Sequence, residues 1–450
     1  MKNISVLFFV LLMLSSCGDS EQKQVEDITH EGPDMELAMR KGVIYEVNVR
    51  QFTPEGTFNA FSEHLPRLRD MGVDIVWLMP IHPIGEKNRK GELGSYYSIK
   101  DYKGINPEFG DEDDFRELVA AAHDLGMLLI LDWVPNHTSW DAVWTETNPE
   151  FYVRENGEFI YPPDTDWTDV IQLDYDNPEM REAMIDAMAY WVTEFNIDGF
   201  RCDVAGFVPN DFWEVAIAEL NEHKDLFWLA EWEDPTHHDV GFHASYAWEL
   251  HHIMNRLAQN EANVDDLIEY WEKEQQTFPS DALRMVFIDN HDENSWNGTI
   301  DERMGANADA MAVFNFTFPG IPLIYTGQEA GLDFRLPFFE KSEVPWGDYV
   351  KAEFYTRLIQ LKKENNALWN APFGGGLTFY DSPDNVLVYS RDGDFNTVVV
   401  ILNLDNDTQE VEFPLDVHTT TEFFSGERAH LHEGDVISVS PNSFTVWVNN

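Results

Sequence analysis

The chain has 450 residues, enough for two or three domains, and carries 29 basic against 82 acidic residues, a formal net charge of −53. A polyanion repels phosphate groups, so this charge argues against nucleic acid as a partner and against docking through a basic patch. A hydrophobic content of 43% provides for folded cores and excludes a disordered chain. The excess of acid is therefore a surface property that serves solubility or adaptation to salt.

The N-terminus has the pattern of an export signal. Lys2 precedes an apolar run at 6–14 that is too short to span a bilayer. The run ends in LSSC (14–17), which resembles a bacterial lipobox with Cys17 as the lipidated residue. Residues 1–17 are interpreted as a lipoprotein signal peptide and residues 18–36 as an acidic tether, with an ordinary signal peptide as the alternative. We expect an exported protein anchored in a bacterial cell envelope by lipid, at a membrane and face left open.

Short apolar runs alternate with amphipathic stretches from residue 42 to about residue 330. Strands are predicted at 43–49, 74–80, 127–135, 198–204, 227–232, 244–248, 283–290 and 322–327, with helices such as 115–125, 179–195, 212–224 and 264–275 between them. Eight strand–helix units favour an α/β fold of the (β/α)8 TIM-barrel type over a doubly wound sheet. The barrel is expected over 37–371, with a short insertion at 138–174 after the third strand.

The pattern changes after residue 371. Apolar runs such as NVLVYS and TVVVIL alternate with turn residues, which predicts an antiparallel β-sandwich over 372–450. A structural role is expected for this module, with starch binding as the alternative. Because Cys17 is assigned to lipid, the second cysteine, Cys202, has no partner for a disulfide and is expected to be packed in the core.

Polar side chains follow several of the predicted barrel strands, at the face where the active sites of such barrels lie. They are Asp132, Asn136 and His137 after strand three, Arg201 and Asp203 after strand four, Glu231 after strand five, and His291 and Asp292 after strand seven. Each has a structural alternative, such as capping a helix or holding a loop. Their convergence on one rim favours a catalytic site, because carboxylates buried together cost free energy unless they are paired or functional.

Glycoside hydrolysis is the chemistry that uses such a set. A retaining enzyme needs a carboxylate nucleophile and a carboxylic acid about 5–5.5 Å apart, and adjacent strand ends can hold Asp203 and Glu231 in this way. Arg201 lies two residues before Asp203, hence on the same strand face, and is expected to keep that carboxylate ionised. Glu231 follows the apolar run FWLA, an environment suited to a general acid. Asp292 is left to hold sugar hydroxyls or to stabilise the transition state.

Four segments resemble the signature regions of the α-amylase family, glycoside hydrolase family 13, and they occur in the family's order. They are DWVPNHTS (132–139), GFRCDVAG (199–206), LAEWED (229–234) and VFIDNHDEN (286–294). The resemblance implies that Asp203 is the nucleophile, Glu231 the acid/base and Asp292 the stabiliser of the transition state. It implies substrate binding by Tyr97, His137, Arg201, His291 and Asp101, with Asp132 and Asp101 orienting the other groups.

The chemistry implied needs no cofactor, but calcium-binding members of the family use positions that Asn136 and Asp174 match here. Oxygen ligands of this kind suit a structural Ca²⁺. The Lys-His pair that many α-amylases carry after the nucleophile is replaced by Gly206-Phe207, which leaves endo-action on long starch open.

The sequence therefore predicts a retaining α-glycosidase that hydrolyses α-1,4-linked glucans or maltooligosaccharides. One alternative is a transglycosylase or isomerase that uses the same residues and excludes water from the acceptor site. Another is a glucan-binding lipoprotein without activity, since a fold does not fix function. Oligomeric state stays open.

Overall fold

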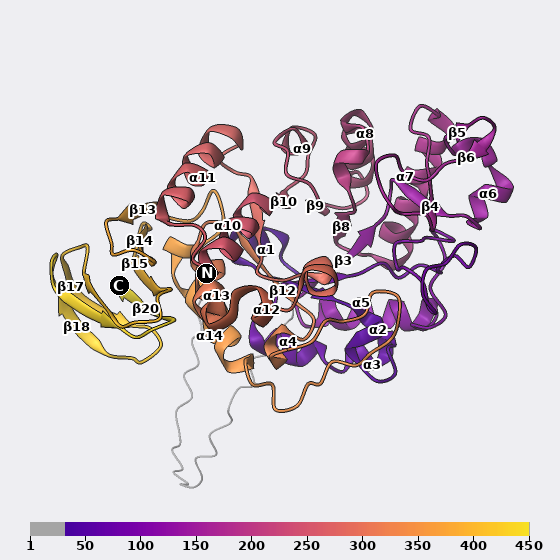
Figure 1. The fold of residues 1–450 in the computed structure, drawn as a ribbon. Helices are drawn as coiled ribbons and strands as arrows, with labels where there is room; N and C mark the ends of the chain where they lie inside the picture. The colour runs from indigo at the N-terminus through magenta and orange to yellow at the C-terminus, as the bar shows by residue number, and fades with distance from the viewer. Residues whose placement is uncertain (1–31, 450) are drawn as a thin grey trace, which may run out of the picture.

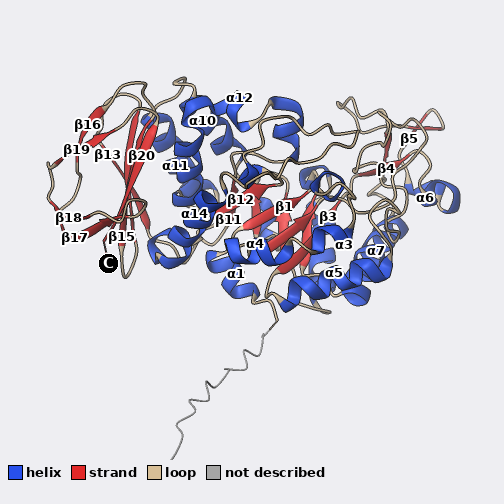
Figure 2. Ribbon diagram, turned by 90° about the horizontal axis from the view of Figure 1, so that it is seen from below, coloured by secondary structure: helices blue, strands red, loops and turns tan. Residues whose placement is uncertain are grey.

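The computed structural model describes residues 32–449. Eight parallel strands close into a barrel in which chain neighbours are also neighbours in space, and β12 pairs with β1 to complete the circle. This is the predicted (β/α)8 fold, with the strands enclosed by helices (Figure 2). The barrel strands are β1 (Ile44–Val47), β2 (Ile75–Leu78), β3 (Leu128–Trp133), β8 (Gly199–Cys202), β9 (Phe227–Ala230), β10 (Ala244–Tyr246), β11 (Leu283–Val286) and β12 (Ile321–Tyr325).

Most of these strands are shorter than the apolar runs that predict them. The run at 43–49 stops as a strand at Val47 because a short helix starts at Val49. The run at 283–290 is a strand only to Val286, and its remaining residues cross the rim of the barrel as a buried loop. The apolar runs in the sequence are longer than the strands because buried loop residues next to the strands are apolar as well.

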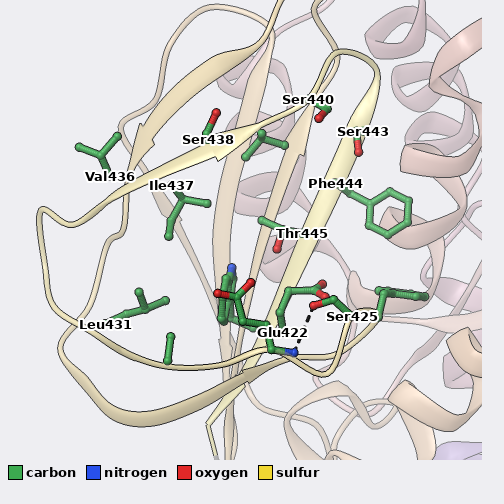
Figure 3. Close-up of a pocket in the computed structure, with 15 residues that line it drawn as sticks. Glu422, Ser425, Leu431, Val436, Ile437, Ser438, Ser440, Ser443, Phe444 and Thr445 are labelled. Atoms are coloured by element: carbon green, nitrogen blue, oxygen red, sulfur yellow. Dashed lines mark hydrogen bonds between the residues drawn. The ribbon is translucent and has the colours of Figure 1, made fainter.

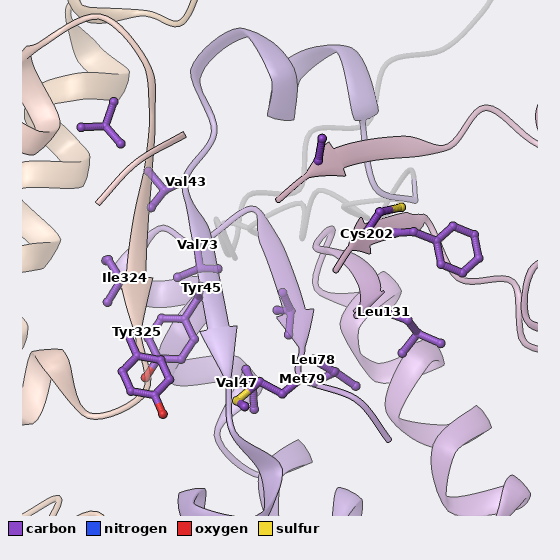
Figure 4. Packing of buried hydrophobic residues seen from close by; sticks show 14 of the residues in the cluster. Val43, Tyr45, Val47, Val73, Leu78, Met79, Leu131, Cys202, Ile324 and Tyr325 are labelled. Atoms are coloured by element: carbon purple, nitrogen blue, oxygen red, sulfur yellow. The ribbon is translucent and has the colours of Figure 1, made fainter. Parts of the chain in front are cut away.

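Alternation along the strands separates an inner from an outer layer of side chains. Ile44, Leu128 and Ile130 belong to the cluster that fills the barrel, whereas Tyr45, Val47 and Leu131 belong to the larger cluster under the helices. Figure 4 shows part of this outer layer, with Cys202 among its members. Burial raises the pKa of the Cys202 thiol well above its usual range, so this residue is a packed core side chain, as expected.

Helices of the barrel begin at recognisable caps. Asp111 forms a capping box at the start of α5, and Asn177 caps α7 through two backbone N–H groups. The helices are α1 (Met35–Lys41), α2 (Val49–Phe52), α3 (Phe58–Ser62), α4 (Leu65–Met71), α5 (Glu112–Asp124), α6 (Val143–Thr147), α7 (Pro178–Phe195), α8 (Asn210–Asn221), α9 (Thr236–Asp239), α10 (Trp248–Ala258), α11 (Val264–Thr277), α12 (Ile300–Met304), α13 (Ala308–Thr317) and α14 (Ala352–Glu364).

The insertion after β3 contains two small antiparallel pairs. One joins β4 (His137–Ser139) to β7 (Val170–Gln172), and the other joins β5 (Arg154–Glu155) to β6 (Glu158–Phe159). In the first pair His137 is opposite Gln172, so the insertion is tied directly to a predicted site residue.

After α14 the chain forms two antiparallel sheets beside the barrel (Figure 1). The larger sheet has the order β13-β14-β15-β20-β17-β18, the smaller one pairs β16 with β19, and a hydrophobic cluster lies between them. The strands are β13 (Gly376–Tyr380), β14 (Val386–Asp392), β15 (Thr397–Asn403), β16 (Gln409–Glu412), β17 (Val417–Glu422), β18 (Arg428–Leu431), β19 (Val436–Val439) and β20 (Ser443–Asn449). The antiparallel module expected from the sequence is present.

The predicted signal peptide and Cys17 lie outside the described residues. Helix α1 begins at Met35, within the end of the expected tether, and its first turn is capped by Asp34. Among residues 32–449 no helix is both long and apolar enough to cross a membrane.

Candidate active site

A pocket of about 540 Å³ opens where the barrel strands end. Its lining brings together residues from five barrel loops and from the insertion: Lys90, Ser95, Tyr97, His137, Asp166, Trp167, Asp169, Val170, Asp203, Val204, Glu231, His291, Asp292, Trp296, Phe338 and Phe339. The three predicted catalytic carboxylates, Asp203, Glu231 and Asp292, all face this one cavity.

The guanidinium of Arg201 connects the carboxylates beneath the pocket. Its Nη1 donates to Asp203 Oδ1 at 3.0 Å and to Asp132 Oδ1 at 2.8 Å, while Nη2 lies 2.8 Å from Glu231 Oε1. Arg201 is fully buried and is not part of the pocket lining. It therefore positions the carboxylates from beneath the pocket. The contact between Arg201 and a bound sugar that the resemblance implied stays a prediction.

The protonation of Asp203 differs from the expectation based on Arg201 alone. Burial raises the pKa of Asp203 well above its usual range, and the nearby Glu231 raises it further. The charge of Arg201 lowers the pKa of Asp203 but does not outweigh these two effects. The net rise contradicts the expectation that Arg201 keeps Asp203 ionised. The charge of Glu231 is thus close enough to affect the ionisation of Asp203.

Val204 follows Asp203 in a left-handed conformation, with φ 37° and ψ 49°. This conformation is rare for a β-branched residue and stores backbone strain. It directs the Val204 N–H to Oε2 of Glu231 at 2.7 Å. Glu231 is thus held by Arg201 through one oxygen and by Val204 through the other.

His291 lies in a chain of hydrogen bonds along the opposite wall. Its Nε2 is 2.8 Å from the Tyr97 hydroxyl, which donates to Asp132 Oδ2 at 3.0 Å, and its Nδ1 is 2.5 Å from Glu46 Oε1. Burial opposes a charge on His291, but the carboxylates of Asp292 and Glu46 outweigh it and raise the pKa of His291 to about 9. The ring of Tyr97 stacks on that of His291, with centroids 5.3 Å apart.

His137 is held as a neutral donor. Gln172 Nε2 donates to Asn136 Oδ1 at 2.9 Å, and Asn136 Nδ2 lies 3.2 Å from His137 Nδ1. Burial lowers the pKa of His137 to about 3, against a hydrogen bond with the Tyr97 backbone that raises it. Because Nδ1 accepts from Asn136, the proton of neutral His137 is on Nε2.

The two predicted calcium ligands do not form a ready set of oxygen ligands. The side-chain oxygen of Asn136 accepts from Gln172, and Oδ1 of Asp174 accepts from the Asp176 N–H at 3.0 Å. Nowhere in residues 32–449 do three or more His, Cys, Asp or Glu side chains cluster in a way that could hold a metal ion. The calcium site at Asn136 and Asp174 stays a prediction.

The structure does not bring Asp101 into the pocket. Its carboxylate accepts from the Lys103 N–H at 3.0 Å, a contact within its own turn, and Asp101 is absent from the lining. The predicted substrate contact of Asp101 has no support in this arrangement. Asp132, by contrast, is buried and accepts hydrogen bonds from Arg201, Tyr97 and Trp77.

An aromatic surface lies beside Glu231. The ring of Trp232 covers Gly206 so closely that a Cβ there would be 2.1 Å from Cε2 of the indole. Phe207 packs against Trp232 at 5.3 Å and against Trp167 at 6.2 Å, and it remains 42% exposed. We call Trp167, Phe207 and Trp232 the aromatic platform. Glycine is required at 206 because Trp232 occupies the space that a side chain would need.

Other tryptophans near the rim either line the pocket or pack within the protein. Trp296 lines the pocket with Phe338, at a centroid distance of 5.1 Å. Trp140 donates to the carbonyl of Thr168 within the insertion, and Trp144 packs on Tyr102 outside it, so these two hold the insertion in place.

Sequence reasoning missed several residues around the carboxylates. Glu46 contacts His291, Trp77 donates to Asp132, and Tyr246 accepts from Arg201 Nε at 3.2 Å. Glu46 is the only charged residue in the apolar run VIYEVNV, and this could have marked it as a functional residue. Phe338 and Phe339 come from the irregular segment after β12, where no periodic pattern points to the pocket.

A second hollow of about 670 Å³ lies in the C-terminal sheets (Figure 3). It is lined by Ser438, Ser440, Ser443 and Phe444 among others, and its Glu422 accepts from the Ser425 N–H at 2.6 Å. Hydroxyl and apolar groups predominate there, without the convergent acids of the barrel pocket. The barrel pocket is therefore the candidate active site.

The fold and the site together define a glycoside hydrolase of the (β/α)8-barrel class. The chain belongs to the α-amylase family, because the family model described as the alpha amylase catalytic domain matches residues 16–168 and 165–367.

Individual proteins of this family are similar to the chain along most of its length. It is 28% identical over 428 residues to alpha-amylase MalA of Haloarcula japonica, a match that covers 90% of this chain and 61% of that relative. A crystal structure of an alpha-amylase from Lactobacillus plantarum aligns with a TM-score of 0.81 and 28% identity, covering 92% of this chain and all of that one. A maltogenic alpha-amylase, AmyB from Thermotoga neapolitana, aligns with a TM-score of 0.81 and 29% identity over 91% of this chain and 98% of its own.

Proposed function

We propose that this protein is a retaining α-glycosidase that hydrolyses α-1,4-linked glucans and maltooligosaccharides through a covalent glycosyl-enzyme intermediate. The observation that carries the proposal is the bridging of Asp203 and Glu231 by one buried guanidinium at the floor of the pocket. This arrangement holds two carboxyl groups close together, as the retaining mechanism requires.

In the first step, a carboxylate oxygen of Asp203 attacks the anomeric carbon of the sugar bound against Tyr97. Glu231 gives its proton to the glycosidic oxygen as the bond to the leaving sugar breaks. Positive charge develops at the anomeric centre, and Asp292, whose side chain is 36% exposed toward the pocket, supplies a compensating negative charge.

In the second step, Glu231 is an anion and takes a proton from a water molecule. That water attacks the anomeric carbon and releases Asp203, and two inversions give net retention of the α configuration. The N–H of Val204 and the guanidinium of Arg201 hold Glu231 in place through both steps.

Proton NMR of maltoheptaose incubated with residues 18–450 tests this function. New reducing ends that appear first as the α anomer are expected, and the product lengths distinguish endo- from exo-action. Reducing ends that appear first as the β anomer would contradict the retaining mechanism.

Transfer to a sugar acceptor is a second candidate, and the aromatic platform favours it. Apolar rings next to the acid/base offer a surface for a sugar ring and displace water from the side of the leaving group. Longer oligomers in the same NMR experiment would identify transfer, and non-reducing products would identify isomerisation.

We further propose that the reaction itself needs no metal, because carboxyl groups supply the nucleophile, the acid and the base. The calcium expectation rests on Asn136 and Asp174, whose oxygens are engaged within the protein. Dialysis against EDTA is expected to leave turnover and the melting temperature unchanged. A loss of stability that Ca²⁺ restores would establish a structural calcium site.

We also propose that the protein is exported and anchored to a bacterial membrane through lipid on Cys17. The sequence LSSC (14–17) supports this proposal. Expression with a radiolabelled fatty acid is expected to label the wild type and to leave a Cys17→Ser variant unlabelled. Equal labelling of both would overturn the anchor.

A further inference from the structure

Glu46 is a carboxylate inside the barrel, on a strand that the catalytic mechanism does not otherwise use. It shares the inner face of β1 with Ile44, two residues earlier, and it is fully buried. Its Oε1 contacts His291 Nδ1 at 2.5 Å, and its Oε2 has no hydrogen-bond partner within residues 32–449. A buried carboxylate with an unpaired oxygen costs stability, so packing alone does not explain this residue.

The hydrogen bonds along this wall define where the protons of His291 are. The Tyr97 hydroxyl has one proton and donates it to Asp132 Oδ2. At the 2.8 Å contact between Tyr97 and His291, the histidine Nε2 must therefore be the donor. Glu46 accepts at Nδ1, so both ring nitrogens carry protons and His291 is an imidazolium.

Charged groups of both signs face this imidazolium. Glu46 from β1 and Asp292 from its own loop, at 3.5 Å from Nε2, favour the positive charge, and so does Asp132 behind Tyr97. Arg201 from β8 disfavours it, as does burial against the Tyr97 and Phe338 rings. Asp292 is open to the pocket, whereas Glu46 is enclosed and its charge is not available to substrate.

We propose that Glu46 is a positioning residue, which holds His291 doubly protonated so that its Nε2–H is fixed on Tyr97 and its charge lies beside Asp292. The proposal rests on the proposed function, because Tyr97 and Asp292 are the groups that hold the reacting sugar there. Glu46 acts through His291 and does not itself touch substrate.

The variant Glu46→Gln tests this role, because the amide keeps the shape and an acceptor oxygen but loses the charge. We expect kcat on maltoheptaose to fall roughly 10- to 100-fold through misplacement of Tyr97 and Asp292. In a plot of kcat against pH, the alkaline limb is expected to move to lower pH by about one unit or more, because His291 loses its proton more easily in this variant.

Asp198→Asn is the matched control. Asp198 is also a buried carboxylate on a histidine, with Oδ2 2.8 Å from His123 Nε2, but it precedes β8 at the opposite end of the barrel. This variant is expected to lower the melting temperature and to leave the alkaline limb in place. A shift of the limb in both variants would assign the effect to general destabilisation and overturn the proposal.

Proton titration of His291 by nitrogen-15 NMR, assigned by comparison with His291→Asn, gives a readout independent of turnover and of whether Glu46→Gln folds. In the wild type, His291 is expected to remain protonated above pH 8, in keeping with its pKa of about 9. Titration of His291 near the ordinary value of about 6.5 would overturn the proposal. If the wild type does not cleave any α-glucan, the proposed function fails by itself, and this titration still decides whether His291 is held protonated.

Discussion

The backbone N–H of Val204 donates to Oε2 of Glu231 at 2.7 Å from a left-handed conformation that valine rarely adopts. Val204 follows the proposed nucleophile directly, and Glu231 is the proposed acid/base. One strained residue thus fixes the position of the acid relative to the nucleophile. Strain of this kind persists where the surrounding structure enforces it, and Arg201, bound to both carboxylates, belongs to that surrounding structure.

Replacing Val204 by glycine relieves this strain. A β-branched residue in this conformation lowers the stability of the fold by about 1–3 kcal/mol. Glycine lowers it by about 0.5–1 kcal/mol, because it gives the unfolded chain more conformational entropy. We expect the free energy of unfolding, measured in urea, to stay level or to rise by about 1 kcal/mol. Activity is expected to fall, because Val204 lines the pocket and its backbone becomes free to move. A clear loss of stability would show that the valine side chain contributes more by packing than its backbone costs.

Replacing Asp203 by asparagine removes the nucleophile and keeps its shape. Turnover of maltoheptaose is expected to fall by roughly 10⁴-fold or more. The melting temperature is expected to be maintained, because the substitution removes a negative charge that lies close to Glu231. Substantial residual cleavage by a folded Asp203→Asn protein would rule out Asp203 as the nucleophile.

The stability of the protein is expected to decline in alkaline solution through His291. Its folded pKa of about 9 is above the ordinary value of about 6.5, so the folded state holds this proton more tightly than the unfolded state. The resulting stability is complete below about pH 6.5 and is lost as the pH rises through about 9. Melting temperatures across this range measure the effect, which His291→Asn is expected to reduce. An equal decline in that variant would assign the pH dependence to other groups.

The aromatic platform is expected to bind the sugar on the leaving-group side. Phe207→Ala removes one ring, worth about 1 kcal/mol, so kcat/KM for maltoheptaose is expected to fall roughly fivefold. Hydrolysis of α-maltosyl fluoride, which has no leaving sugar, is expected to be unaffected. Phe395→Ala is the control, because Phe395 is 83% exposed and belongs to the C-terminal sheets. An equal fall of kcat/KM for maltoheptaose and for α-maltosyl fluoride would show that Phe207 does not bind the leaving sugar.

The pattern of residues along the chain is sufficient to predict the barrel fold and the face on which the site lies. Buried parallel strands read as apolar runs, and their alternation with amphipathic helices predicts the eight-stranded barrel. Because all parallel strands end at one face, residues such as Asp203, Glu231 and Asp292 could be assigned to a common site before their distances were known. Asp101, which follows no strand and was assigned by resemblance alone, is one of the candidates absent from the pocket lining.

Only the tertiary structure decided the contacts between residues far apart in the chain. The ionisation of Asp203 depends on burial and on Glu231, which a neighbouring strand supplies, and both outweigh the Arg201 that the local sequence placed beside it. The charge of His291 depends on Glu46, 245 positions away. Periodicity along the sequence reports which face a side chain occupies, but the electrostatic environment of a buried group is the sum over every element packed around it.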